Sequence, residues 1–304
     1  MDILISAMLP IALVALVGFG VGRSFDLDMQ TLARVNIYAL LPALVLTSLA
    51  NTTLGLEDAL AIIATFLLNT ALLYLLAVGL SRRLAFSLDE QKSLIATTLF
   101  SNVGNLGLPF ILFALGEAGL ERGVVYLVGS SVMIATVFPI VLKGAGLRAG
   151  VQVTLSLPVF WAAIAGVGLQ VAQGAIPLPI EGGLAMLAEG AIPVALLTLG
   201  VQLARTELVF GRYELLGSAL RLVVSPLLAY GIATGLGLQG LDRQVVVLQA
   251  AMPVAVNSLI WVMELGGDSG TDRFANRIRV ARTIVLSTVL SVVSLPVVLW
   301  LSGL

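Results

Sequence analysis

Long apolar runs, separated by short polar or charged stretches, make up most of the chain. A helix needs about 20 consecutive apolar residues to cross the hydrocarbon core of a bilayer. Ten runs are of about this length, so the pattern predicts ten transmembrane helices with short connections and no inserted soluble domain. The predicted spans are residues 3–22, 32–50, 59–80, 93–116, 123–142, 155–171, 183–204, 215–236, 245–265 and 280–301. The first span follows Asp2 rather than a basic segment, and we expect it to be retained rather than cleaved as a signal peptide.

Two predicted spans contain residues that disfavour a regular helix. Residues 101–109 in the fourth span are SNVGNLGLP, where Gly107 and Pro109 predict a structural break. Residues 251–258 in the ninth span are AMPVAVNS, where Pro253 predicts another. An interrupted helix leaves unsatisfied amides at the start of its outgoing half, at the positive end of its dipole. Two breaks at matching depth would cross, and we expect a pocket that attracts anions without any cationic side chain.

Four pairs of spans match in order at displacements of 148–157 residues, nearly half the chain. PALVLT at 42–47 matches PVALLT at 193–198, FPIVL at 138–142 matches LPVVL at 295–299, and Asn105 matches Asn257. In the first and sixth spans, Leu9, Pro10, Gly18 and Gly20 match Leu157, Pro158, Gly166 and Gly168. We therefore expect two repeats, residues 1–146 and 147–304, which insert in opposite orientations because five spans is an odd number. Inverted repeats with interrupted helices are typical of secondary transporters, whose site lies near the bilayer midplane.

The distribution of Lys and Arg predicts the orientation in the membrane. Thirteen of the 16 basic residues fall in the loops on one side and only Arg122 and Arg243 on the other, while Arg221 lies inside the eighth span. Cytoplasmic loops carry the excess of positive charge. This distribution predicts a multi-pass protein of the cell (inner) membrane, with the N-terminus and C-terminus outside.

Composition excludes most other classes of protein. The chain is 59% hydrophobic and 11% charged, with no His and no Cys. It therefore has no thiolate or imidazole metal ligand and no Ser-His or Cys-His catalytic pair, and we expect no enzyme activity, metal or cofactor. Its basic residues are scattered rather than gathered in a stripe, so we expect no nucleic acid partner. The expected partners are the lipid bilayer and a small solute.

The polar residues at the two interruptions are the candidate substrate-binding residues. Asparagine amides there could cap the exposed helix ends or bond a carboxylate directly. The predicted set is Ser101, Asn102, Gly104, Asn105, Pro253, Val254, Asn257 and Ser258.

Three further residues are candidates for coupling or gating. Asn69 in the third span could instead hold helices together, and Arg221 could instead extend to the cytoplasmic interface. Glu189 in the seventh span is the carboxylate deepest in a predicted span, but water on the outer side could solvate it.

Five segments of the chain resemble the auxin efflux carrier family of bacteria and plants, within the bile/arsenite/riboflavin transporter superfamily. They are SNVGNLGLPF, AMPVAVNSLIWVMELGGD, IYALLPALVLTSLA, AIPVALLTLGVQL and RLVVSPLL. The resemblance covers essentially the whole chain and is closest to the bacterial members, and the two interrupted spans are its specific part. Ser101 stands where the plant carriers have proline and Val254 where they have asparagine, so the specificity for auxin is not carried over.

The resemblance implies an all-α membrane fold of ten helices in two inverted five-helix repeats. Helices 4 and 9 would be broken and cross, as in bile-acid symporters and sodium/proton antiporters. Helices 1, 2, 6 and 7 would form a scaffold domain through which the protein is a homodimer. Helices 3–5 and 8–10 would form a transport domain that moves in an elevator-like manner.

The combined expectation is a secondary active or potential-driven transporter of small organic anions, auxin-like or malate-like carboxylates. No carboxylate lies at either interruption, which argues against a tightly held sodium ion there, while proton coupling and uniport stay open. The alternatives are a sodium- or proton-coupled symporter or antiporter of the same fold, and a non-transporting membrane sensor. An antiporter would need an acidic residue at the crossing and a sensor an output domain, and the sequence shows neither.

Overall fold

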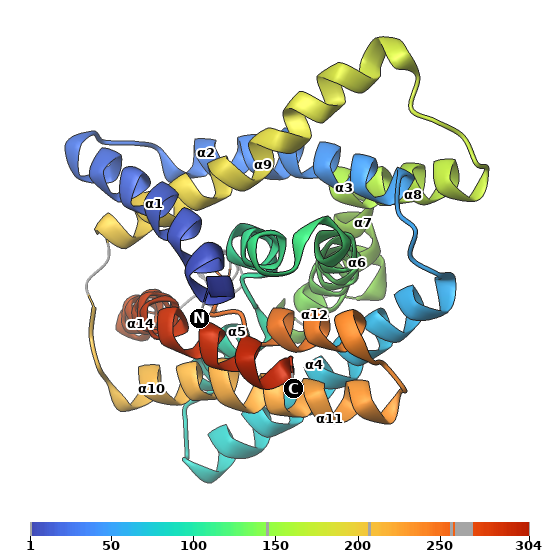
Figure 1. The fold of residues 1–304 in the computed structure, drawn as a ribbon. Helices are drawn as coiled ribbons and strands as arrows, with labels where there is room; N and C mark the ends of the chain where they lie inside the picture. Colours follow the sequence, from blue (N-terminus) through green and yellow to red (C-terminus); the bar gives the residue numbers. More distant parts are fainter. Residues whose placement is uncertain (1, 144–145, 206–207, 256–257, 259–269, 304) are drawn as a thin grey trace. The chain divides into compact units, whose positions relative to one another are not determined.

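A computed structural model describes residues 2–143, 146–205, 208–255, 258 and 270–303 (Figure 1). Within these residues the chain is helical apart from short connections and contains no β-strand. Three π-helical turns (η) interrupt the α-helices. The elements are α1 (Asp2–Ser24), α2 (Met29–Val35), η1 (Asn36–Leu40), α3 (Leu41–Ala50), α4 (Leu56–Arg83), α5 (Leu88–Leu99), η2 (Val103–Gly107), α6 (Leu108–Lys143), α7 (Leu147–Ser156), α8 (Pro158–Val171), α9 (Leu178–Arg205), α10 (Arg212–Ala219), η3 (Leu220–Val224), α11 (Ser225–Gly235), α12 (Gly240–Ala250) and α14 (Gly270–Ser302).

Seven helices in the described residues are long and apolar enough to cross a membrane, and an eighth span results if α7 and α8 count as one. The number is smaller than ten for three reasons. The predicted fourth and fifth spans share α6, the predicted sixth span falls on α8 of only 14 residues, and α12 has only 11 residues. The described residues therefore form an all-helical protein with seven or eight candidate membrane spans, while the ten-helix inverted repeat stays a prediction.

Gly116 divides α6 where the fourth predicted span ends. Its φ of 71° and ψ of −169° are not helical, although the hydrogen-bonded helices on either side join across it. This conformation is accessible to glycine because glycine has no Cβ. Residues before and after Gly116 are thus two helical segments, which is the arrangement that separate fourth and fifth spans require.

Each of the three π-helical turns is followed, two residues after its last residue, by a proline: Pro42, Pro109 or Pro226. Proline lacks an N–H, and its ring displaces the carbonyl four residues earlier. A π turn accommodates that displacement within the helix. Gly107 therefore lies in the π-helical turn and Pro109 in the first turn of α6, so the helix is irregular but continuous at these two residues.

The chain forms two compact units. Unit 1 comprises Met1–Ala59, Gly104–Val137 and Leu147–Arg205, and unit 2 comprises Leu60–Val103, Phe138–Gly146 and Thr206–Leu304. Each unit draws on both predicted halves of the chain. The scaffold and transport domains stay predictions.

Close backbone approaches between helices in unit 1 depend on glycine. α1 packs on α9, and a methyl group at Gly18 would overlap the backbone of Leu197 (Figure 1). Gly200 of α9 makes the same kind of approach to α1. α8 packs on α3, and a methyl group at Gly166 would lie 3.0 Å from the carbonyl oxygen of Leu46. Small residues let membrane helices approach in this way.

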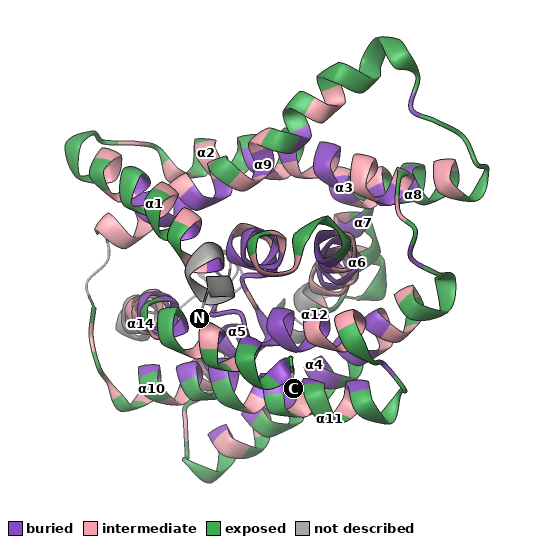
Figure 2. Ribbon diagram, viewed as in Figure 1, coloured by how far each residue is buried: buried purple, intermediate pink, exposed green. Residues whose placement is uncertain are grey.

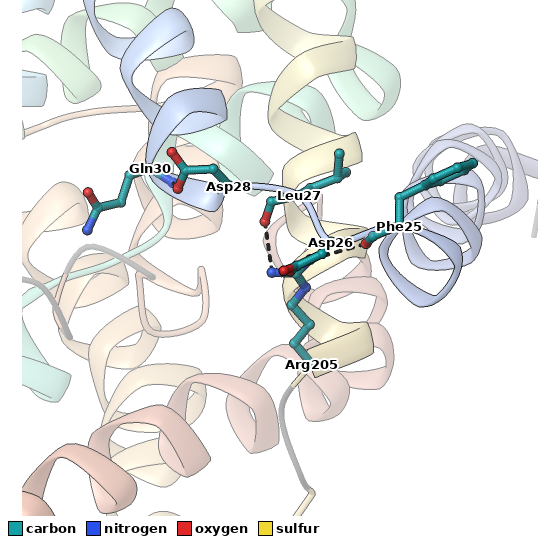
Figure 3. Close-up of polar contacts among 6 residues, drawn as sticks. All are labelled: Phe25, Asp26, Leu27, Asp28, Gln30 and Arg205. Atoms are coloured by element: carbon teal, nitrogen blue, oxygen red, sulfur yellow. Dashed lines mark hydrogen bonds and ion pairs between the residues drawn. The ribbon is translucent and has the colours of Figure 1, made fainter.

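Arg205, the last residue of α9, holds the connection between α1 and α2 (Figure 3). Its guanidinium donates to the carbonyl oxygens of Phe25 at 3.2 Å and Leu27 at 2.8 Å, and it pairs with the Asp26 carboxylate at 3.0 Å. All of these groups belong to unit 1. The contact is exposed, so it orders the connection more than it stabilises the fold.

One buried hydrophobic cluster of unit 2 forms where α4, α5 and η3 meet. Its buried members are Leu73, Ala77, Leu94, Ile95, Leu99 and Leu220. α14 packs against α5, α10 and α12. The two longest stretches that are buried at every residue are 93–100 and 245–255 (Figure 2). These are the stretches in which α5 and α12 end.

Candidate functional site

The fourth predicted span is interrupted at residues 100–102, after α5. α5 begins with a capping box, in which the Ser87 side chain accepts from the Glu90 amide and the Glu90 side chain accepts from the Ser87 amide. It ends at Leu99, and Phe100 is extended with φ −85° and ψ 103°. Helical backbone resumes at Val103. The interruption therefore lies ahead of Gly107 and Pro109 rather than at them.

The ninth predicted span is interrupted at residues 251–255, after α12. Within unit 2, Ser101 and Val254 form an antiparallel bridge between the two interruptions. The Asn102 amide donates to the Pro253 carbonyl at 2.8 Å, and the Ala255 amide donates to the Phe100 carbonyl at 2.9 Å. Backbone groups that leave the helices thus satisfy one another, as buried polar groups must.

Side chains around this bridge stabilise it. The Ser101 hydroxyl donates to the Gln249 carbonyl at 3.1 Å. The Val254 amide donates to the Ser287 hydroxyl oxygen of α14, also at 3.1 Å. Ser258 is buried, and its hydroxyl donates to the carbonyl of Ala255 at 2.6 Å. One hydrogen-bonded arrangement therefore includes four of the predicted site residues, Ser101, Pro253, Val254 and Ser258.

Asn102 is the predicted site residue at this bridge whose side chain is an amide and lies within the described residues. The residue is 4% exposed, and its Nδ2 has no hydrogen-bond partner among the described residues. A buried amide donor without a partner costs about 1–3 kcal/mol, so such groups in native proteins usually meet water or a ligand. An N–H donor suits a carboxylate.

Arg221 also lies beside the two interruptions. The sequence did not indicate its structural role there. It is 2% exposed, and its guanidinium donates to the carbonyls of Thr98 at 3.0 Å, Ala250 at 2.9 Å and Met252 at 3.3 Å. The side chain is buried in unit 2, so the alternative that it extends to the cytoplasmic interface is wrong. The expectation of a pocket without any cationic side chain did not include Arg221, whose guanidinium bonds carbonyls at the ends of α5 and α12.

Asn105 and Gly104 belong to unit 1, whereas Asn102 belongs to unit 2. The Asn105 side-chain oxygen accepts from the Nδ2 of Asn36 at 3.4 Å. Asn36 is buried in η1 and was not predicted, although an amide inside an apolar span is itself a signal. Asn257 lies outside the described residues.

The coupling candidates differ in burial. Asn69 is 2% exposed in α4, and its Nδ2 donates to the Ser225 hydroxyl oxygen at 3.1 Å within unit 2. Glu189 is exposed on α9 in unit 1. Among the described residues no group of three or more acidic side chains is placed to hold a metal ion.

Comparison with known proteins identifies the family. The model for the family described as membrane transport protein matches residues 3–152 and 151–299. An uncharacterized transporter of Methanothermobacter thermautotrophicus is 32% identical over 282 residues, which cover 90% of this chain and 88% of that protein. An uncharacterized transporter of Methanocaldococcus jannaschii is 28% identical over 192 residues, 58% of this chain and 60% of the relative. The resemblance to the auxin efflux carriers is confirmed, and the chain belongs to this family of membrane transport proteins.

Proposed function

We propose that the protein is a secondary carrier that moves small organic anions across the cell membrane by alternating access. Membership of a transporter family supports a transport function rather than an enzymatic one. The observation that carries the proposal further is the antiparallel contact between two interrupted helices within unit 2. Irregular backbone at membrane depth is tolerated where protein surrounds it or where it lines a cavity.

The substrate class follows from the donors at this contact. Asn102 contributes a buried amide donor, and a helix resumes after it at Val103. The first amides of a helix have no partner within the helix. Both features favour a carboxylate. The sequence adds Asn105 and Asn257 to the proposed substrate-binding residues, and a mono- or dicarboxylate is the proposed cargo.

The remaining features of the proposal follow the family resemblance. A scaffold of helices 1, 2, 6 and 7 forms a homodimer, and the other helices carry the substrate in an elevator-like movement. Both termini lie outside the cell. Flux is driven by the membrane potential or by a coupled ion.

Counterflow in proteoliposomes tests the proposal. Vesicles are loaded with unlabelled malate or indole-3-acetate, and uptake of the same labelled compound is measured. A hydrogen bond to a charged group contributes about 1.5–3 kcal/mol, so Asn102→Ala should weaken carboxylate affinity by about 10-fold to 100-fold. Asn51→Ala is the matched control, because Asn51 is an exposed asparagine at the end of α3.

Three results would contradict the proposal. Wild-type protein that exchanges neither probe is not a carrier for these carboxylate classes. Saturable binding without exchange would favour a sensor. Unchanged affinity and rate in Asn102→Ala, Asn105→Ala and Asn257→Ala, each folded as the wild type, would exclude the site.

A further inference from the structure

We propose that Arg221 is the positioning residue of the crossing. Its guanidinium holds the C-terminal ends of α5 and α12 together and offsets their negative charge, so that the crossing selects anions. It acts through the two helix ends rather than by touching the substrate. The selection of anions rests on the proposed function, whereas the effect on the helix ends does not.

The hydrogen bonds of Arg221 account for carbonyls that the interruptions leave open. The last carbonyls of a helix have no partner within the helix. Thr98 lies in the last turn of α5, Ala250 is the last residue of α12, and Met252 follows within the second interruption. Nη1 donates to Thr98, Nη2 donates to Ala250, and Nη2 and Nε both lie 3.3 Å from the Met252 oxygen. A planar guanidinium with five N–H donors can connect two helix ends at once, which a lysine ammonium cannot do in the same geometry.

The charge of Arg221 balances the two helix ends. The C-terminal end of a helix carries about half a negative charge, so two such ends carry about one. One guanidinium offsets this charge, and the helix ends in turn make burial of the cation tolerable. Without Arg221 the two negative ends would repel an anion bound at the bridge.

The helix that carries Arg221 is itself fixed. Arg221 lies in η3, the π-helical turn that precedes Pro226. One turn later, the Ser225 hydroxyl accepts the hydrogen bond from Asn69 of α4. Leu220, next to Arg221, lies in the buried core with α4 and α5. The guanidinium is therefore held by a braced helix, as a positioning role requires.

A cross-linking experiment tests the geometry without any substrate. The chain contains no cysteine, so Ser101→Cys with Val254→Cys introduces the only pair. Opposed residues of an antiparallel pair have Cα atoms about 4.5–5.5 Å apart, which suits a disulfide. The rate of disulfide formation under mild oxidation is measured by mass spectrometry in wild-type, Arg221→Lys and Arg221→Gln backgrounds. Loss of the hydrogen bonds in Arg221→Gln should slow the reaction by about fivefold or more, with Arg221→Lys between the two.

Arg205→Gln is the matched control. Arg205 also donates to two backbone carbonyls, but it does so at an exposed connection of unit 1 (Figure 3). Its replacement should leave the cross-linking rate unchanged. Equal rates in Arg221→Gln and Arg205→Gln would overturn the positioning role. Where Arg221→Gln does not fold, Arg221→Lys carries the comparison.

Binding of malate and indole-3-acetate tests whether the positive charge of Arg221 contributes to anion affinity. Arg221→Gln removes the charge and should weaken affinity by about tenfold, whereas Arg221→Lys keeps it and should stay within about threefold of wild type. A structural role alone would predict equal losses in the two variants, and that result would overturn the charge role. Wild-type protein that binds neither probe but cross-links in an Arg221-dependent manner would refute the proposed function and leave the positioning role standing. Protein that exchanges carboxylates but cross-links at the same rate without Arg221 would support the proposed function and refute the positioning role.

Discussion

Glu90 shows how one side chain fixes the start of the interrupted fourth span. It lies in the first turn of α5, ahead of the predicted span, and pairs with Arg279 of α14 at 2.9 Å. The hydrogen bond from the Ser87 amide, aided by the Ser87 hydroxyl and by Arg279, holds the pKa of the Glu90 carboxyl below its ordinary value of 4.5. A carboxyl with a lowered pKa stabilises the fold above its unfolded-state pKa, and this stabilisation is lost as the pH falls through the folded-state pKa.

Glu90→Gln should therefore lower the melting temperature at neutral pH and lose this effect in acid. The pair is partly exposed, so we expect a cost of about 0.5–1 kcal/mol at pH 7. Melting curves from pH 7 down to below 4.5 should show the wild type and the variant converging. Asp89→Asn, which removes a carboxylate from the same turn, controls for the helix dipole. Curves that stay parallel at every pH would contradict the assignment.

Residue types indicated part of the candidate site, and tertiary contacts decided the rest. Asn102 stands out in the sequence because an apolar span contains few amides, and Pro253 stands out through its place beside Asn257 in the span that matches the fourth. Arg221 bonds carbonyls of residues 31 and 123 positions away, and the sequence gives no sign of which backbone groups it meets. Asn36 likewise meets Asn105 across 69 positions. Backbone carbonyls are the same in every residue, so contacts of this kind leave no pattern in the sequence.

At the scale of helices, apolar length predicted where the chain is helical but not where helices bend. α7 lies almost entirely ahead of the predicted sixth span, 155–171, and it is a helix that meets α8 at 70°. Leu157 is extended there with φ −82° and ψ 120°, because the residue before a proline avoids the helical region. Gly116 bends α6 through a positive φ, which a glycine permits but does not require. Such residues mark possible bends, and the packing around them decides which ones occur.

Two glycines on α1 give a matched test of helix packing. A methyl group at Gly18 would overlap the Leu197 backbone of α9, whereas one at Gly20 would meet nothing within 4 Å. Gly18→Ala should destabilise the protein by about 1–3 kcal/mol because the helices must separate. Gly20→Ala should be neutral or stabilising by up to about 1 kcal/mol, because alanine favours the helix. The melting temperatures of both variants decide the matter, and equal effects would contradict the close packing of α1 on α9.

At the scale of the whole molecule, packing in unit 1 supports the predicted internal symmetry. The repeat relates the first span (α1) to the sixth (α8) and the second span (α3) to the seventh (α9). The contact of α1 with α9 should therefore correspond to the contact of α8 with α3. Both contacts occur, and the matching glycines behave alike: Gly18 and Gly166 face a close neighbour, while Gly20 and Gly168 have open space. A duplicated unit is expected to show this correspondence both in its sequence and in its helix contacts.

The number of spans before residue 146 decides whether the first repeat has five spans. If the segments on either side of Gly116 are two spans, residue 146 lies opposite to Asn51, because three spans separate them. If they form one span, the two residues lie on the same side. Asn51→Cys and Gly146→Cys, both at exposed positions of a chain without cysteine, report this through a membrane-impermeant maleimide.

The distribution of positive charge predicts which of these cysteines is outside. In intact cells Asn51→Cys should react with the maleimide, and Gly146→Cys should react only after the membrane is permeabilised. Because the chain has no other thiol, each signal has a single origin. Labelling of both from outside would show that residues 108–143 cross once, and the inverted repeat would then be lost, since an even number of spans leaves both halves in the same orientation.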